Sequence, residues 1–240
     1  MLTKTDGIVL HSLKHTDSSA IVTIYTRQFG RASYMVYGAN KKKSKFRSAF
    51  LQPLSLVSLD VLHVPGKEIQ SIKDIRIHYP FTGIPFDPVK NSLAIFIAEV
   101  LYRTLKRAEA DDNLYQFIEK SVEALDCCQA GLANFHLVFL LKLTRYLGFS
   151  PNNDGSDSDF FDLINGDFGR IRPAHAHFLL PQMTRVFSQA LQVDYVSMEQ
   201  LKLNRDVRYK LLEAIVEYYR LHVPDFYGLN SLVVLHALFD

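Results

Sequence analysis

The hydrophobic pattern of this 240-residue chain changes its period at Tyr79-Pro80, and that change limits the folds open to the chain. Before it, apolar residues alternate with polar ones over short runs, as in residues 31–37, which is the period of a half-buried strand. After it, apolar residues recur every three to four positions over long stretches, which is the period of a helix packed against a core. The sequence therefore predicts an α+β protein, with a β domain over residues 1–80 followed by an all-α domain over residues 81–240.

The β domain contains five short runs that are typical of strands. They cover roughly residues 3–13, 20–25, 31–37, 54–64 and 68–77. In the fourth run the apolar phase shifts by one residue between Leu56 and Val57, which predicts a β-bulge and a sharp bend in that strand. Five short strands with a bent one among them favour a small closed barrel. An open sandwich of similar size is the alternative.

Helix signals follow the change of period. Asp87 can cap a helix that has Pro88 at its first position, and Gly148 is well placed to end a helix that begins near Leu132. Further apolar stripes at helical spacing cover about residues 114–125, 205–221 and 230–238, with another helix from about residue 184. The stretch from Phe149 to Pro173 is rich in Asp, Asn, Ser and Gly, and it predicts an acidic loop near residues 150–173.

Charge is divided unevenly between the two parts of the chain. Residues 1–80 hold 12 Lys/Arg and 5 Asp/Glu, whereas residues 81–240 hold 15 and 20, so the net charges are +7 and −5. The whole chain carries only +2. This split suggests two modules and a polyanion as the partner of the first.

Much of the positive charge lies in one short segment, from Gly38 to Ser48. It contains five cations and no acid: Lys41, Lys42, Lys43, Lys45 and Arg47. Arg27 and Arg31 flank the preceding turn, and aromatic residues are interleaved with the cations over residues 25–46. Because cations neutralise phosphates and rings stack on unpaired bases, the pattern predicts a nucleic-acid site built on these seven cations. A solvated loop that only keeps the protein soluble is the alternative.

Several short motifs also follow one another in a fixed order. Between Thr16 and Pro53 they are Thr26-Arg27, Gly30-Arg31, Gly38-Ala39, the lysine-rich segment and Leu51-Gln52-Pro53. This ordered set resembles the amino-terminal signature of the RecO family of bacterial DNA repair and recombination mediators. Leu147-Gly148 with Pro151, and the late segments YYRLHV and LNSLVVL, resemble the carboxy-terminal part of the family more loosely.

The resemblance implies an oligonucleotide-binding (OB) barrel followed by a helical domain. It also implies binding to single- and double-stranded DNA, annealing of complementary strands, and loading of RecA onto DNA coated with single-stranded DNA-binding protein (SSB). The implied partners are RecR and the acidic, hydrophobic tail of SSB. An OB-fold module that binds RNA or protein in translation or ribosome assembly is the alternative function.

Capture of an acidic tail needs an apolar slot with cations at its mouth. The helical domain is net negative, so such a rim must be local. The candidates are Arg103, Lys106 and Arg107 at the end of the first predicted helix, and Arg145 on the third. The alternative is that these cations merely complement the carboxyl ends of their helices.

Metal sites are not expected. Many family members carry a four-cysteine zinc site after the Leu-Gly helix, but residues 149–169 contain no cysteine here, so a thiolate site is excluded at that place. An EF-hand loop needs Gly at its sixth position and Glu at its twelfth; counted from Asp154, these positions hold Asp159 and Asn165. His175 and His177 have no further ligand nearby and are expected to be surface residues.

No catalytic motif is recognisable either. The chain contains no GxxxxGKS/T, GxSxG or HExxH, so we predict that it is not an enzyme and uses no cofactor. No apolar run reaches the ~18 residues that span a membrane, and the first residues lack the order of a secretion signal. The only cysteines, Cys127 and Cys128, are adjacent and give no disulfide framework. These features predict a cytoplasmic protein.

Overall fold

The computed structural model describes residues 2–37, 48–106, 108–152 and 158–238, apart from the side chains of residues 48, 49 and 236–238. The chain forms two compact units: residues 1–127 with 229–232, and residues 128–228 with 233–240. The change from strands to helices falls at the predicted place. The predicted division into domains between residues 80 and 81 stays a prediction.

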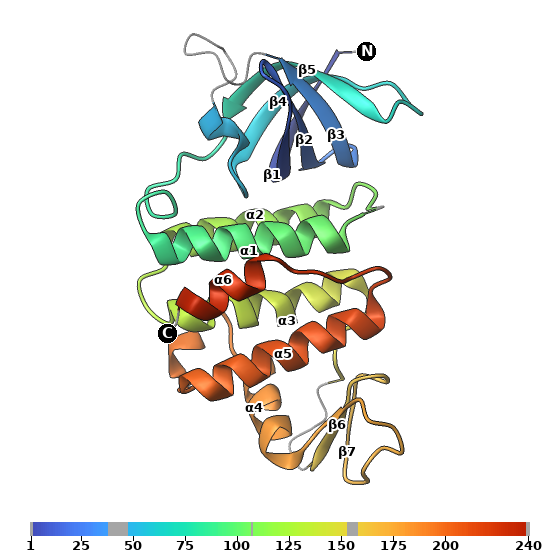
Figure 1. The fold of residues 1–240 in the computed structure, drawn as a ribbon, viewed down its shortest axis with the longest axis vertical. Helices are drawn as coiled ribbons and strands as arrows, with labels where there is room; N and C mark the ends of the chain where they lie inside the picture. Colours follow the sequence, from blue (N-terminus) through green and yellow to red (C-terminus); the bar gives the residue numbers. More distant parts are fainter. Residues whose placement is uncertain (1, 38–47, 107, 153–157, 239–240) are drawn as a thin grey trace. The chain divides into compact units, whose positions relative to one another are not determined.

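The first unit begins with a closed five-stranded barrel (Figure 1). Its strands are β1 (Leu2–Thr16), β2 (Ser19–Thr26), β3 (Gly30–Tyr37), β4 (Leu56–Leu62) and β5 (Ile69–Ile77). The order around the barrel is β1-β2-β3-β5-β4, and β1 closes the ring by pairing with β4. All neighbours are antiparallel except β3 and β5. This is an OB-like barrel, so the α+β class and the closed barrel are confirmed and the sandwich is excluded.

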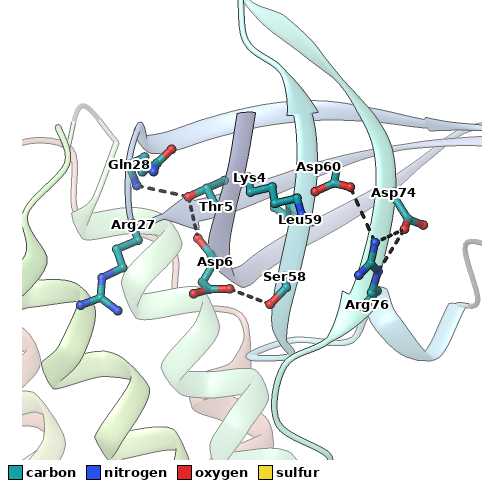
Figure 2. Close-up of a pocket in the computed structure, with 10 residues that line it drawn as sticks. All are labelled: Lys4, Thr5, Asp6, Arg27, Gln28, Ser58, Leu59, Asp60, Asp74 and Arg76. Atoms are coloured by element: carbon teal, nitrogen blue, oxygen red, sulfur yellow. Dashed lines mark hydrogen bonds and ion pairs between the residues drawn. The ribbon is translucent and has the colours of Figure 1, made fainter. Parts of the chain in front are cut away.

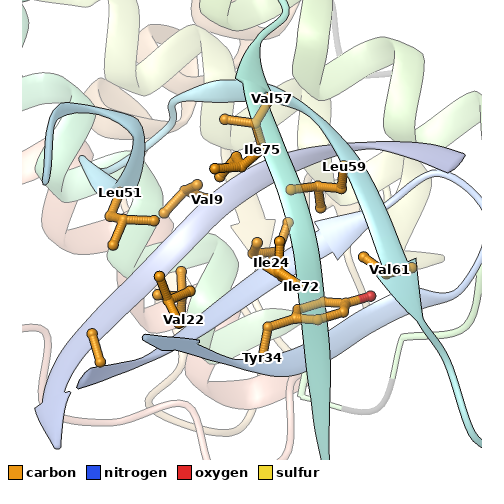
Figure 3. Close-up of a cluster of buried hydrophobic side chains, with 12 residues drawn as sticks. Val9, Val22, Ile24, Tyr34, Leu51, Val57, Leu59, Val61, Ile72 and Ile75 are labelled. Atoms are coloured by element: carbon orange, nitrogen blue, oxygen red, sulfur yellow. The ribbon is translucent and has the colours of Figure 1, made fainter. Parts of the chain in front are cut away.

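The interior of the barrel is filled by apolar side chains that alternate along each strand (Figure 3). Val22 and Ile24 on β2, and Tyr34 on β3, are fully buried there. Leu51, from the short 3-10 helix η1 (Ser48–Leu51), belongs to the same core. Alternation with period two therefore fixes which face of each strand points inward.

The predicted bulge between Leu56 and Val57 is wrong. β4 pairs with β1 in unbroken register from Leu56 to Leu62. Leu54, which created the apparent phase shift, lies before the strand in a left-handed conformation with φ of 62°. The actual irregularity is opposite Asp60 and Val61, where the pairing passes over Lys73 of β5.

Two helices cover part of the outer surface of the barrel. They are α1 (Pro88–Thr104) and α2 (Asp112–Cys127), which lie side by side in Figure 1. Asp87 caps α1 as predicted, because its carboxylate accepts hydrogen bonds from the first turn. Because α1 packs against β1, that strand is buried on both faces around Ile8, Val9 and Leu10. The barrel, α1 and α2 belong to the same compact unit.

The second unit is mainly helical. It contains α3 (Phe135–Leu147), preceded by η2 (Leu132–Asn134), then α4 (Pro181–Gln192), η3 (Met198–Gln200) and α5 (Arg205–His222); α6 spans Ser231–Leu238. Gly148 ends α3 in a left-handed conformation with φ of 83°, as expected.

Regular structure that the sequence did not indicate begins within the predicted acidic loop and continues beyond it. A small sheet with the order β7-β6-β8 is formed by β6 (Phe160–Asp162), β7 (Asp167–Gly169) and β8 (Phe178–Leu179). Strands of two or three residues are too short to show a period. They are held by aromatic packing, in which the ring of Phe161 lies 4.5 Å from that of Phe187 and 5.7 Å from that of Tyr218.

Candidate nucleic-acid interface

The seven cations of the predicted DNA site divide into two groups. Lys41, Lys42, Lys43, Lys45 and Arg47 lie outside the described residues. Arg27 and Arg31 are described, at the end of β2 and the start of β3. Both side chains contact α1 or α2.

Arg27 contacts α2. Its guanidinium forms an ion pair with Asp112 and lies 5.6 Å from the ring centre of Tyr115. The hydrogen bond between the two charged groups raises the pKa of Arg27 and lowers the pKa of Asp112. Arg27 therefore connects the β2–β3 turn to the first turn of α2.

Arg31 contacts the end of α1 and the segment that follows it. Its Nη1 donates to the carbonyl of Tyr102 at 2.7 Å, and its guanidinium lies 4.4 Å from the ring centre of Tyr102. Its backbone N–H donates to the carbonyl of Ala108 at 3.0 Å. Burial lowers the pKa of this guanidinium. The two arginines thus fasten the helices to the barrel, and their role in binding DNA stays a prediction.

Arg31 also lines a groove of about 410 Å³ on the barrel, which we call the cationic groove. Its walls come from β3, from the β4–β5 connection and from the segment between α1 and α2. The lining residues are Arg31, Ala32, Ser33, His63, Gly66, Lys67, Glu68, Gln70 and Lys106. Three Lys or Arg side chains face one carboxylate here, so the groove favours an anionic ligand.

The β4–β5 connection is held in place beneath this groove. The Gln70 side chain accepts a hydrogen bond from Val64 N–H at 2.8 Å and donates to the carbonyls of Val64 and Lys67 at 2.9 and 2.7 Å. The ring of His63 stacks on Phe29, with centres 4.0 Å apart and planes 6° from parallel. The groove is therefore pre-formed, which lowers the entropic cost of binding.

A second pocket, of about 260 Å³, lies on the outer face of β1, β4 and β5 (Figure 2). Its charged residues are Lys4, Asp6, Arg27, Asp60, Asp74 and Arg76. Asp60 and Asp74 oppose each other across β4 and β5, and Arg76 lies 3.7 and 2.9 Å from their carboxylates. Three cations balanced by three carboxylates do not attract a polyanion, so this pocket is a poorer nucleic-acid site than the cationic groove.

The four cations predicted to bind a protein tail do not share one setting. Arg103 lies 3.7 Å from Glu99 on the same helix. Lys106 lines the cationic groove, beside Arg31. Arg107 lies outside the described residues, and Arg145 is exposed in the last turn of α3, in the second unit. The structure thus brings together Arg31 of the predicted DNA site and Lys106 of the predicted tail site. The tail site itself stays a prediction.

Neither histidine singled out in the sequence belongs to a metal centre in the described part of the chain. Nε2 of His175 lies 3.1 Å from Asp162, and Nδ1 of His177 lies 3.2 Å from Glu217. Within these described ranges, no three His, Cys, Asp or Glu side chains gather as metal ligands. Independence from metal remains a prediction.

Sequence reasoning missed most of the cationic groove. The sequence did not single out Ser33, His63, Lys67 or Gln70. Nothing in the sequence shows that β3 pairs with β5, and that pairing places these residues beside Arg31.

The fold and the groove define a class: an OB-like barrel with an anion-attracting groove, followed by a helical region. Two family models match the chain, "Recombination protein O N terminal" over residues 1–81 and "Recombination protein O C terminal" over residues 85–231. Proteins named DNA repair protein RecO are 42% identical in Bacteroides fragilis, 41% in Phocaeicola vulgatus and 32% in Flavobacterium psychrophilum, with each match covering 100% of both chains. The chain therefore belongs to the RecO family of DNA repair proteins. Among the helices described, none is long and apolar enough to cross a membrane.

Proposed function

We propose that this chain is a recombination mediator that binds single- and double-stranded DNA, anneals complementary strands and, with RecR, helps to load RecA onto SSB-coated DNA. It does so without catalysing a reaction and acts in the cytoplasm. The observation that carries the proposal is the cationic groove on the OB-like barrel of a RecO-family chain. The lysine-rich segment at residues 41–47 adds five cations to the same module.

Annealing follows from the same electrostatics. A cationic surface screens the repulsion between two phosphate backbones and raises their local concentration. Strands held by their phosphates keep their base edges available for pairing. No nucleophile, base or metal is needed, which agrees with a chain that works by binding alone.

Binding at the groove is tested by neutralising its cations in the full chain. Lys67→Gln with Lys106→Gln should weaken binding to all DNA sequences alike. The plot of log affinity against log salt has a negative slope, and its magnitude should decrease by about 0.7 per lost phosphate contact on single strands and about 0.9 on duplex. Lys4→Gln, in the mixed-charge pocket, is the matched control and should change neither. Unchanged affinity in the double variant would move the site off the groove.

The lysine-rich segment needs its own variant. Charge reversal at Lys42 and Lys43 should weaken binding and flatten the salt dependence in the same way. If only this variant loses affinity, the segment rather than the groove carries the phosphate contacts.

A competition between single-stranded DNA, duplex DNA and RNA separates the proposal from the alternative. Faster annealing of complementary strands, bare or SSB-coated, supports a mediator. Equal or tighter binding to RNA without annealing would favour an RNA-binding module in translation or ribosome assembly.

Partner binding is the most indirect part of the proposal. A labelled acidic tail peptide titrated against the full chain should lose affinity in Arg103→Gln or Arg145→Gln, and at high salt. Lys120→Gln, which removes an exposed cation of α2 that pairs with Glu123, is the control. Loss in Lys106→Gln alone would place the tail in the cationic groove instead.

A further inference from the structure

The cationic groove is closed at the end where β3 begins. The backbone of residues 108–110 packs so closely there that a Cβ on Gly30 would lie 2.8 Å from the nitrogen of Ala110. The Arg31 N–H donates to the carbonyl of Ala108 at 3.0 Å, which holds the segment in place. The segment therefore blocks the groove beyond Arg31, and a nucleotide chain that lies in the groove cannot continue in that direction.

Arg31 lies at this closed end with a charge that no carboxylate compensates. Its guanidinium is half-buried, and burial lowers its pKa. In the described part of the chain, the groups that act on it are the ring and the carbonyl of Tyr102, and that carbonyl accepts only one of the five N–H groups. A partly buried cation without a counter-ion is costly. An anion that binds in the groove would remove that cost.

The remaining polar groups of the groove converge on a small volume. Ser33, two residues after Arg31, lies on the same face of β3 and offers a hydroxyl. Lys67 adds an ammonium group from the β4–β5 connection, and Lys106 adds one from the segment after α1. Glu68 is the one carboxylate among the described lining residues. Donors from three parts of the first unit thus line about 410 Å³, which suits one compact, highly charged group better than an extended backbone.

The phosphate group at the end of a DNA strand has this chemistry. A phosphate monoester carries a charge of about −1.5 to −2 at neutral pH and exposes three acceptor oxygens. A phosphate inside the strand carries a single charge, and the strand continues on both sides of it. Because the groove is blocked beyond Arg31, an internal phosphate could reach that end only if the strand turned back sharply. A terminal phosphate meets no such obstacle, and it can accept two hydrogen bonds from one guanidinium.

We propose that the closed end of the cationic groove binds the terminal phosphate of a DNA strand, with Arg31, Ser33 and Lys106 as its donors. The inference rests on the proposed DNA binding and names the part of the DNA that the groove prefers. Single strands and duplexes both have such ends, so the site favours ends over continuous strands rather than one form of DNA over the other. It thereby directs the protein to breaks that leave a phosphate.

Strand ends of defined chemistry test this preference in the full chain. One single-stranded sequence is compared with a phosphate at its first or its last nucleotide, with hydroxyls at both ends, and as a closed circle. A phosphorylated end should bind about tenfold tighter than the hydroxyl-ended strand, which is the factor that one charge-assisted hydrogen bond supplies. The circle should bind no tighter than the hydroxyl-ended strand. A hydroxyl-ended strand that is longer by one nucleotide carries one more phosphate and controls for total charge.

Variants locate the preference in the groove. Ser33→Ala should lower the preference about threefold without changing the salt dependence, because it removes a neutral donor and no charge. Lys106→Gln should weaken binding to every strand and also reduce the preference. Lys4→Gln, in the pocket on β1, β4 and β5, should keep the full preference. Phosphorus NMR adds a direct readout, because the monoester signal is separate from the diester signals. That signal should shift on binding to wild type, and less on binding to Lys106→Gln.

The outcomes separate this inference from the proposed function. If wild type binds none of these strands at physiological salt, the proposed function fails. If it binds them all alike, the circle included, only the terminal-phosphate site is refuted. A preference that Ser33→Ala and Lys106→Gln both leave intact would place the phosphate elsewhere and also refute the site. If a free mononucleotide displaces the phosphorylated strand as readily as an unlabelled phosphorylated strand does, the groove belongs to a free phosphate compound and the proposal is overturned.

Discussion

Replacing Asp126 tests what holds the link between β5 and α1. The carboxylate is buried at the end of α2 and accepts hydrogen bonds from the N–H groups of Thr82, Gly83 and Ile84 at 2.9, 2.8 and 2.7 Å. The Thr82 hydroxyl donates a further bond at 3.2 Å, and the Asp126 carbonyl accepts from the buried ammonium of Lys90 at 2.7 Å. One residue of α2 therefore orders the whole link.

The magnitude follows from the groups that would be left without partners. Asp126→Ala removes the acceptor of three N–H groups, and each buried donor left unsatisfied costs about 1–3 kcal/mol. Thr82 is exposed and Ile84 is buried, so water compensates part of the loss, and we expect about 3–5 kcal/mol of unfolding free energy to disappear. Asp126→Asn keeps one acceptor oxygen but loses the charge, and should cost about 2 kcal/mol.

The assay is urea unfolding followed by circular dichroism, with Glu123→Gln as the control on the same helix. Glu123 pairs with the exposed Lys120, and such a surface pair contributes at most about 1 kcal/mol. Asp126→Asn within ~0.5 kcal/mol of wild type would refute the reasoning, because charge-assisted bonds to a buried carboxylate contribute more than that.

The same residue predicts a pH dependence. Burial raises the pKa of Asp126, but the hydrogen bonds from Thr82, Ile84 and Gly83 outweigh it and hold the pKa below its usual value. Because the folded pKa is depressed, this stabilisation is present above the unfolded pKa of about 3.9 and is lost as the pH falls through the folded pKa. Asp126→Asn should lack this component of the acid-induced loss of stability.

Three further predictions concern stability. Tyr115→Phe should leave the unfolding free energy unchanged or raise it by up to ~1 kcal/mol, because the hydroxyl is buried with no hydrogen-bond partner in the described structure; a loss above ~1 kcal/mol would contradict this. Gly30→Ala should cost more than ~2 kcal/mol, since φ is 62° and a Cβ would lie 2.4 Å from the carbonyl of Ala108; Gly148→Ala, with φ of 83° and nothing within 4 Å, should cost only ~1 kcal/mol. Burial raises the pKa of Asp162, but the hydrogen bonds it accepts hold the pKa below normal, so the protection of the amides of residues 160–169, measured against their intrinsic exchange rates, should fall below about pH 4 in wild type, and Asp162→Asn should lack this dependence.

Most of the fold could be predicted because its elements are long enough to show a period. The barrel strands alternate over five or more residues, and Asp87 and Gly148 mark helix ends by local chemistry alone. The sheet of residues 160–179 could not be predicted, since strands of two or three residues show no period. The bulge was misplaced because Leu54 is buried outside any strand.

The candidate site was predictable only in part. The sequence shows that the excess of Lys and Arg lies in the barrel half of the chain. It does not show which of these cations share a surface. Arg31 and Lys106 lie 75 positions apart, and they line one groove because α1 packs back onto β1. Such a juxtaposition depends on helix–sheet packing, which no local pattern encodes.

The motifs Thr26-Arg27 and Gly30-Arg31, which resemble the family signature, also lie where the barrel contacts α1, α2 and the segment between them. We call this contact the joint. Because Gly30 has no Cβ, the backbone of residues 108–110 can pack against it more closely than any side chain would permit. The Arg31 side chain donates a hydrogen bond to the carbonyl of Tyr102. The Thr26 hydroxyl donates to the Gly30 carbonyl at 2.9 Å and orders the turn between them. The groove is built across this joint, with Arg31 on the barrel side and Lys106 on the helix side.

Loosening the joint should therefore lower DNA affinity without removing a phosphate contact. Gly30→Ala displaces the segment after α1. The distance between Arg31 on the barrel and Lys106 in that segment should therefore change, while every charge remains. We expect weaker binding to single strands and duplex alike, with protein that remains folded by circular dichroism. Gly148→Ala, which affects no such joint, should bind as wild type. Equal affinity in folded Gly30→Ala would contradict this, because it would mean either that the groove does not depend on the docking of α1 or that the DNA is not held in the groove.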